Sequence, residues 1–121
     1  MILVDTSIWI DHLRGGGDLL AKLLNASRVL THPFVIGELA LGEMHQRSAI
    51  LDALLNLPRA ELASDAEVLS FINRQALFGR GIGYVDVHLL ASVRLTAGAQ
   101  LWTRDNRLRS AAEELGLAMA S

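Results

Sequence analysis

The first thirteen residues, MILVDTSIWIDHL (residues 1–13), indicate how the fold begins. Residues 2–4 form a short uncharged apolar run that is typical of a buried strand, and apolar side chains then recur at helical spacing as far as Leu13. Asp5 lies at the junction of these two elements. Because the ligand crevice of an open α/β sheet lies at the carboxyl ends of its strands, Asp5 is either a turn residue or a ligand.

The rest of the chain alternates in the same way between short apolar runs and longer segments of helical periodicity. This alternation predicts an α/β fold with a mostly parallel sheet of four to five strands, covered by helices on both faces, in a single domain. The domain is expected to span residues 1–121, with further strands at residues 27–32, 60–63, 100–102 and 117–120. Helices are expected at residues 7–13, 18–25, 33–47, 48–57, 66–78, 85–97 and 106–116, with Asp65 capping the helix at 66–78.

The composition limits the class of protein. The chain has 121 residues, 51% of them hydrophobic, and a mean hydropathy of +0.33, so part of its surface is expected to meet a partner or a second copy. It has no cysteine, which excludes a disulfide framework and a thiolate metal site. No apolar run approaches the roughly 18 residues of a membrane span, and no signal peptide is indicated, so we expect a cytoplasmic protein without membrane contact.

The charge distribution is more informative than its sum. A formal net charge of −2 is not the strongly basic balance that is typical of a nucleic-acid-binding domain. Of the 11 basic residues, however, only Lys22 is a lysine, and arginine is the side chain best suited to bidentate phosphate contacts. Codon bias is the simpler explanation of this count when it is taken alone.

Three further acidic side chains stand at unusual positions. Glu38 lies in the middle of a predicted helix among apolar neighbours such as Phe34, so its carboxylate is expected to be buried and to need a cation, a proton or water. Asp86 and Asp105 each begin a predicted helix, where an N-cap is the simpler interpretation of either one alone. Together with Asp5 they form a set of four acids that is harder to explain by capping.

Carboxylates without cysteine or a suitably spaced histidine pair select a hard cation such as Mg²⁺ or Mn²⁺. Two such cations about 4 Å apart can activate a water molecule and stabilise the leaving oxygen of a phosphodiester. The acids therefore predict phosphoryl hydrolysis. His32 and His88 are interpreted as packing or surface histidines, and Trp9 and Trp102 as core residues.

Four stretches together resemble the successive motifs of the PIN-domain ribonucleases, in particular the VapC-type toxins of toxin–antitoxin pairs. They are ILVDTSIWIDHLR (residues 2–14), HPFVIGELALG (32–42), GRGIGYVDVHLLAS (79–92) and LWTRDNRL (101–108). The resemblance covers essentially the whole chain, with the motifs in order. It implies a compact three-layer α/β/α sandwich whose acidic pocket binds Mg²⁺ or Mn²⁺ and cleaves RNA to leave a 5′-phosphate and a 3′-hydroxyl.

The resemblance also assigns roles to the acids. The four family acids correspond to Asp5, Glu38, Asp86 and Asp105, which it makes the catalytic residues and the metal ligands. Asp5 and Asp86 are the strongest candidates for direct ligands. Glu38 and Asp105 complete the pocket directly or through water.

Other side chains are expected to support the acids or the substrate. Thr6, Ser7 and Thr103 match the family's hydroxyl positions and are expected to orient carboxylates or bound water by hydrogen bonds. Thr6 is alternatively only a hydroxyl at a helix start. Arg80 and Arg104 are the candidates for contact with RNA, although a solvated loop arginine is at least as simple an interpretation of each.

The resemblance further implies a toxin that cuts loops of transfer RNA or ribosomal RNA, a cognate VapB-like antitoxin whose tail covers the pocket, and a toxin homodimer. Two other functions stay open. A phosphoacceptor domain shares the length and architecture, but it needs a lysine after a late strand, and the only lysine is Lys22. A non-catalytic PIN-fold module that binds RNA or protein is the second, and four intact acids are evidence against it.

Overall fold

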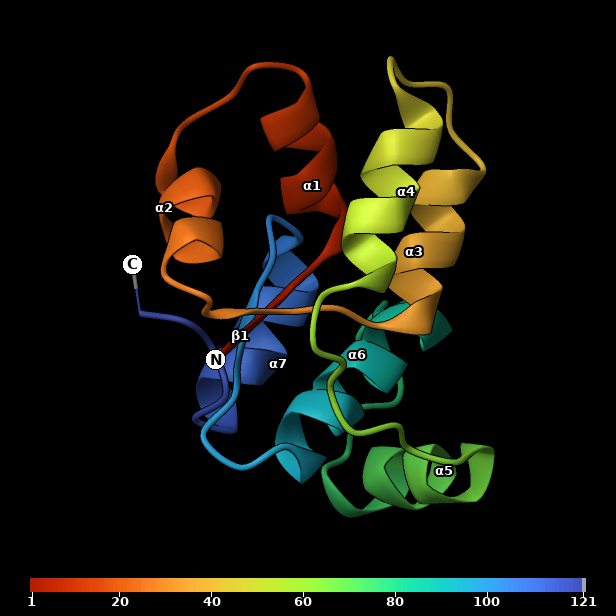
Figure 1. The fold of residues 1–121 in the computed structure, drawn as a ribbon. Coiled ribbons are helices and arrows are strands. Elements are labelled where there is room, and N and C mark those ends of the chain that lie inside the picture. Colours follow the sequence, from red (N-terminus) through yellow and green to blue (C-terminus); the bar gives the residue numbers. More distant parts are fainter. Residues whose placement is uncertain (121) are drawn as a thin grey trace.

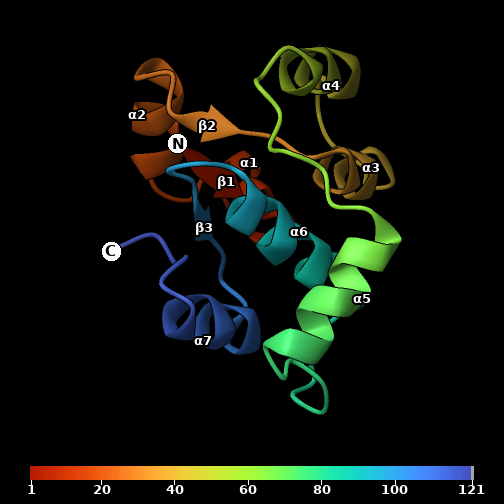
Figure 2. The same cartoon turned by 90° about the horizontal axis from the view of Figure 1, so that it is seen from below.

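The centre of the fold is a short parallel sheet. The computed structural model describes residues 1–120, and its strands are β1 (Ile2–Val4), β2 (Val29–Leu30) and β3 (Gln100–Trp102). Their order is β2-β1-β3, so the first strand of the chain, marked in Figure 1, lies between the other two, as the labels of Figure 2 show. Both pairings are parallel, which brings the carboxyl ends of all three strands to one edge.

The sheet is narrower than the four to five strands that the sequence predicts. Residues 60–63 and 117–120 were expected to be strands, but in the described residues there is one bridge just before the first region, Thr31 with Arg59, and one within the second, Leu101 with Ala118. Pro58 precedes the first of these regions and has no amide hydrogen to donate to a neighbouring strand. It takes part in the pairing only as an acceptor, through the hydrogen bond from the Thr31 amide to its carbonyl (2.8 Å). The α/β class and the parallel sheet are confirmed, while the two outer strands are reduced to single bridges.

Seven helices surround the sheet in the described part of the chain. Helices α3 and α4 lie side by side, whereas α6 packs against β3, α5 and α7 (Figures 1 and 2). None of the helices in residues 1–120 has the length and apolar character needed to cross a membrane. Their bounds are α1 (Thr6–Leu13), α2 (Leu19–Asn25), α3 (Pro33–Ala40), α4 (Arg47–Leu55), α5 (Asp65–Arg74), α6 (Tyr84–Leu95) and α7 (Asn106–Glu114).

The long helix expected at residues 33–47 ends early, at Ala40. The Arg47 guanidinium turns back and donates two hydrogen bonds to the Ala40 carbonyl (2.8 and 3.2 Å), which satisfies an acceptor at the helix end. Gln46 then adopts a left-handed conformation (φ 55°) and starts α4. The apolar pattern runs on through this turn, so periodicity alone could not reveal it.

Helix α5 begins with a different cap from the one expected. Ser64, rather than Asp65, is the N-cap: its hydroxyl accepts from the Glu67 amide (3.1 Å), and the Glu67 carboxylate accepts from the Ser64 amide (2.9 Å). This reciprocal pair is a capping box. Asp65 occupies the first helical position, where its charge also suits the helix dipole.

Removal of this cap is expected to weaken the fold measurably. Ser64→Ala deletes one hydrogen bond of the capping box and should lower the free energy of unfolding by about 1 kcal/mol, as measured by urea denaturation. Ser110→Ala on the exposed side of α7 is the matched control and should change it by less than about 0.5 kcal/mol. Equal values for the two variants would contradict the capping role.

The core consists of the strands and the buried faces of the helices. Leu3, Val4 and Leu101 are fully buried in the sheet, and residues 87–93 of α6 are buried throughout. Trp9 is buried, as predicted, while Trp102 is half-buried against the core. Helix α6 is therefore held on most of its faces, which fixes the position of its first turn.

The two histidines interpreted as packing residues are both buried. His32 caps α3, and its Nδ1 accepts from the Phe34 amide (3.0 Å), while its ring also contacts the Phe34 ring. Burial, with smaller effects of His88 and Arg59, lowers the pKa of His32 to about 4, so this ring is neutral at neutral pH. His88 packs edge-on against Phe34 and Tyr84. The packing interpretation is confirmed for both histidines.

Candidate active site

Asp5 lies where the sequence predicts, between β1 and α1. The side chain is only 5% exposed, and it makes three hydrogen bonds. Oδ1 accepts from the Thr6 amide (2.8 Å), and Oδ2 accepts from the hydroxyls of Ser7 (2.8 Å) and Thr103 (2.7 Å). Asp5 is thus both the N-cap of α1 and a carboxylate held rigidly at the sheet edge.

The end of β3 is joined to the end of β1 by these hydroxyls. Val4 pairs with Trp102, and Thr103 therefore emerges next to Asp5. The Thr103 hydroxyl that donates to Asp5 also accepts from the Asp105 amide (3.1 Å), and the Ser7 hydroxyl accepts from the Arg104 amide (3.2 Å). The loop after β3 is consequently bonded to the loop after β1.

Glu38 is close to this edge, but it is not buried. Its Oε1 accepts from the Thr6 hydroxyl (2.6 Å), which links α3 to α1. The expectation of a buried carboxylate was wrong, because Val35 and Leu39 form the core-facing side of α3 and leave Glu38 exposed. Thr6 is also more than a helix-start hydroxyl, since Asp5 fills the capping position and the Thr6 hydroxyl bonds Glu38.

The two acids at helix starts have different local roles. Asp105 is the N-cap of α7, because its Oδ1 accepts from the amides of Arg107 (2.9 Å) and Leu108 (3.1 Å). The capping interpretation is therefore confirmed for Asp105. It is wrong for Asp86, because the N-cap of α6 is Gly83 and Asp86 lies in the first turn of that helix, half-buried.

Electrostatics show that the four acids share one region. Burial, together with the smaller effects of the negative charges of Asp5, Asp105 and Glu38, raises the pKa of Asp86 to about 6. These three carboxylates belong to three other segments, so each of those segments brings its acid near Asp86. The arrangement concentrates negative charge around Asp86.

This raised pKa predicts a pH dependence of the metal-free fold. An acid whose folded-state pKa is raised stabilises the fold fully below its unfolded value of 3.8, and that contribution is lost as the pH rises through about 6. Asp86→Asn should therefore raise the melting temperature at pH 7.5 and flatten its decline between about pH 4 and 6. Asp52→Asn on exposed α4 is the control, and an Asp86→Asn profile identical to that of wild type would contradict the shift.

The donor set fits a hard divalent cation in chemistry and in charge. All four side chains offer carboxylate oxygens, which Mg²⁺ and Mn²⁺ prefer, and a cation would offset the repulsion felt by Asp86. In residues 1–120, no three histidine, aspartate or glutamate side chains are close enough to form a ready-made coordination shell. The charges of three of the acids affect the pKa of the fourth, Asp86, but a bound cation would have to draw the carboxylates closer to one another.

The two predicted arginines are already paired with carboxylates. Arg104 follows Thr103 and forms an ion pair (2.6 Å) with Asp11, a partly exposed side chain of α1. Arg80 bonds Glu114 at the end of α7 (2.7 Å). Both guanidiniums are thus held by carboxylates at the surface.

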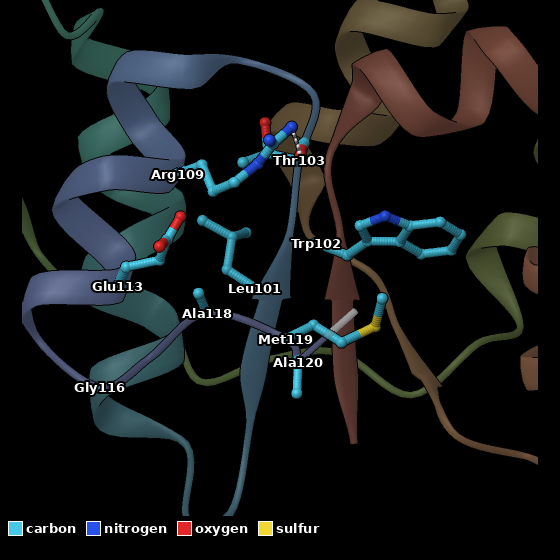
Figure 3. Close-up of a pocket in the computed structure, with 9 residues that line it drawn as sticks. All are labelled: Leu101, Trp102, Thr103, Arg109, Glu113, Gly116, Ala118, Met119 and Ala120. Carbon is cyan, nitrogen blue, oxygen red and sulfur yellow. Dashed lines mark hydrogen bonds between the residues drawn. The ribbon is translucent and has the colours of Figure 1, made fainter.

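One contact was missed by the sequence analysis. Arg109, in α7, donates from Nη2 to the Thr103 carbonyl (3.2 Å) and so reaches the residue that holds Asp5. Only its spacing of four residues from Asp105 could have drawn attention to it. Arg109 also lines a cavity of about 510 Å³ beside β3, which contains Thr103 but none of the four acids (Figure 3).

Comparison with known proteins agrees with this geometry. The family model described as PIN domain matches residues 2–114, a span that contains all four acids. The chain belongs to the PIN-domain family. This PIN domain is also similar to two curated proteins from two strains of Mycobacterium tuberculosis, each named Ribonuclease VapC32. Each is 51% identical over 120 residues, which cover 99% of this chain and 97% of the relative, so the resemblance seen in the sequence is confirmed.

Proposed function

We propose that this PIN domain is a Mg²⁺- or Mn²⁺-dependent endoribonuclease toxin that hydrolyses phosphodiester bonds in loops of transfer or ribosomal RNA and so inhibits translation. One observation carries the proposal: the half-buried Asp86 has its pKa raised by burial and also by the charges of Asp5, Asp105 and Glu38, which come from three other segments. Four carboxylates grouped in this way favour divalent cations and phosphoryl chemistry. The name of the relatives, Ribonuclease VapC32, supports RNA as the substrate.

The four carboxylates are the groups that would hold the metal. When bound, the cations supply an activated water and stabilise the leaving oxygen of the phosphodiester. Asp86 must be ionised to act as a ligand, and its raised pKa means that metal binding and loss of its proton are coupled. Cleavage should therefore weaken as the pH falls below about 6.

The hydroxyls limit how the carboxylates can rotate. Ser7 and Thr103 both donate to Oδ2 of Asp5, and Thr6 donates to Glu38. Outer partners of this kind orient ligands and raise their affinity for metal. The supporting role that the resemblance gives to these three residues therefore has a direct geometric basis.

Arg104 is the better placed of the two candidate RNA contacts. Its amide bonds Ser7, which puts it beside Asp5, and within residues 1–120 the ionic partner of its guanidinium is the partly exposed Asp11. Exposed pairs contribute at most about 1 kcal/mol, so an RNA phosphate can compete for this guanidinium. Arg80 has a similar exposed partner in Glu114. Loops are the expected substrate because unstacked bases are accessible there.

Two protein partners belong to the proposal. A cognate VapB-like antitoxin would neutralise the enzyme, and a second copy would form a homodimer. Large apolar side chains remain exposed in support of such contacts, among them Leu41 (90%), Phe78 (67%) and Leu55 (64%).

The proposal is tested by mapping new RNA ends. The chain is expressed without an antitoxin, and the 5′-phosphate ends of cellular RNA are sequenced. New ends should accumulate at a few loop positions with wild type and disappear with Asp86→Asn. A purified chain that binds Mn²⁺ and RNA, yet produces no new ends, would instead establish the non-catalytic module.

A further inference from the structure

Arg109 connects helix α7 to the end of β3. Its side chain leaves α7 one turn after the Asp105 cap, and its Nη2 donates to the Thr103 carbonyl (3.2 Å). Figure 3 shows the guanidinium crossing from the helix to this carbonyl, with the hydrogen bond drawn as a dashed line. The carbonyl lies just beyond the last strand residue, Trp102, where the pairing within the sheet ends.

Thr103 is the residue through which this contact can act on the acids. Its hydroxyl donates to Oδ2 of Asp5 (2.7 Å) and accepts from the Asp105 amide (3.1 Å). A small rotation of the Thr103 backbone would therefore disturb the Asp5 carboxylate and the backbone of Asp105 together. Arg109 restrains that rotation from the opposite end of the residue, at the carbonyl.

We infer that Arg109 is a positioning residue for the reaction, which acts through Thr103 on Asp5 and Asp105 without touching the reacting atoms. The inference rests on the proposed function. Outer partners of metal-ligand side chains typically change metal affinity or activity by 10- to 100-fold when they are removed. We expect the effect of Arg109 at the lower end of that range, because Ser7 also donates to Asp5.

The surroundings of Arg109 allow its function to be separated from stability. The side chain is exposed and borders the cavity of about 510 Å³, together with Leu101, Glu113 and Met119. Truncation to alanine therefore enlarges an open cavity and leaves no sealed void in the core, so the melting temperature should change little. The same opening admits a free guanidinium ion to the Thr103 carbonyl.

The test compares Arg109→Ala with Arg74→Ala, which removes the same charge from the last turn of α5. The kcat of RNA cleavage should fall about tenfold in Arg109→Ala, with KM changed less than about threefold. Guanidinium at about 20 mM should restore much of this loss, and sodium at the same concentration should not. Arg74→Ala should retain the wild-type kcat.

Amide hydrogen exchange gives a readout that does not depend on cleavage. The amides of Arg104 and Asp105 are bonded to the hydroxyls of Ser7 and Thr103, and they should exchange at least about tenfold faster in Arg109→Ala. Unchanged exchange would overturn the inference, and so would faster exchange with a wild-type kcat. If wild type itself cleaves no RNA, the proposed function fails, and the exchange rates alone decide whether Arg109 holds Thr103.

Discussion

Asp5→Asn is expected to reduce RNA cleavage by about a thousandfold or more, while the protein stays folded. The substitution keeps the size of the side chain, and an amide oxygen can still accept from the Thr6 amide or a hydroxyl. It removes one negative charge from the group of four acids, where a divalent cation would bind, and catalysis by a bound metal depends on that charge. Cleavage of a loop-containing RNA in Mn²⁺ measures the effect.

Asp52→Asn is the matched control for Asp5→Asn. Asp52 is an exposed residue of α4 and does not contribute to the pKa shift of Asp86, so this variant should cleave at the wild-type rate. The melting temperature of each variant is measured in parallel. Wild-type cleavage by a folded Asp5→Asn protein would remove Asp5 from the catalytic machinery.

Removal of divalent metal is expected to have the second large effect, a complete loss of measurable cleavage. Without a cation, the pKa of Asp86 is raised to about 6 by burial and, to a smaller extent, by the charges of the three other carboxylates, and no cation is present to activate water. Protein stripped with a chelator should regain full activity when Mg²⁺ or Mn²⁺ is added in excess. Sodium chloride at matched ionic strength should restore nothing, and cleavage that persists in excess chelator would refute the metal dependence.

Asp86 explains why an active site of this kind is expected to reduce stability. Its carboxylate is half-buried on α6, a helix that the core holds along most of its length, so it cannot move far from the other acids. The protein thus keeps a repulsive arrangement that is relieved by protonation of Asp86 or by a bound cation. If the Asp86→Asn variant is more stable than wild type and no longer cleaves RNA, the wild-type protein sacrifices stability at this position in order to function.

The sequence was sufficient for the features that depend on local pattern. The apolar run before Asp5 and the run before Thr103 became neighbouring parallel strands, which put both residues at one sheet edge. The short helix that follows Asp105 was also placed correctly, because its cap and its apolar spacing agree. These features follow from residues close together in the chain.

The features that the sequence did not reveal depend on distant partners. The break after Ala40 is completed by the Arg47 side chain, and the exposure of Glu38 follows from which face of α3 meets the core. The bond from Thr6 to Glu38 spans 32 positions in the chain, and the contact of Arg109 with Thr103 depends on where α7 docks. No periodicity encodes such contacts, since they arise only when the elements have packed.

The central claim is that four acids from four segments form one divalent-cation centre, and Mn²⁺ titration by calorimetry tests it most directly. Wild type, free of antitoxin, should bind Mn²⁺ at pH 7.5 at least about tenfold more tightly than Asp5→Asn or Asp86→Asn. Asp52→Asn should bind like wild type. Equal Mn²⁺ affinity in all four proteins would contradict the claim.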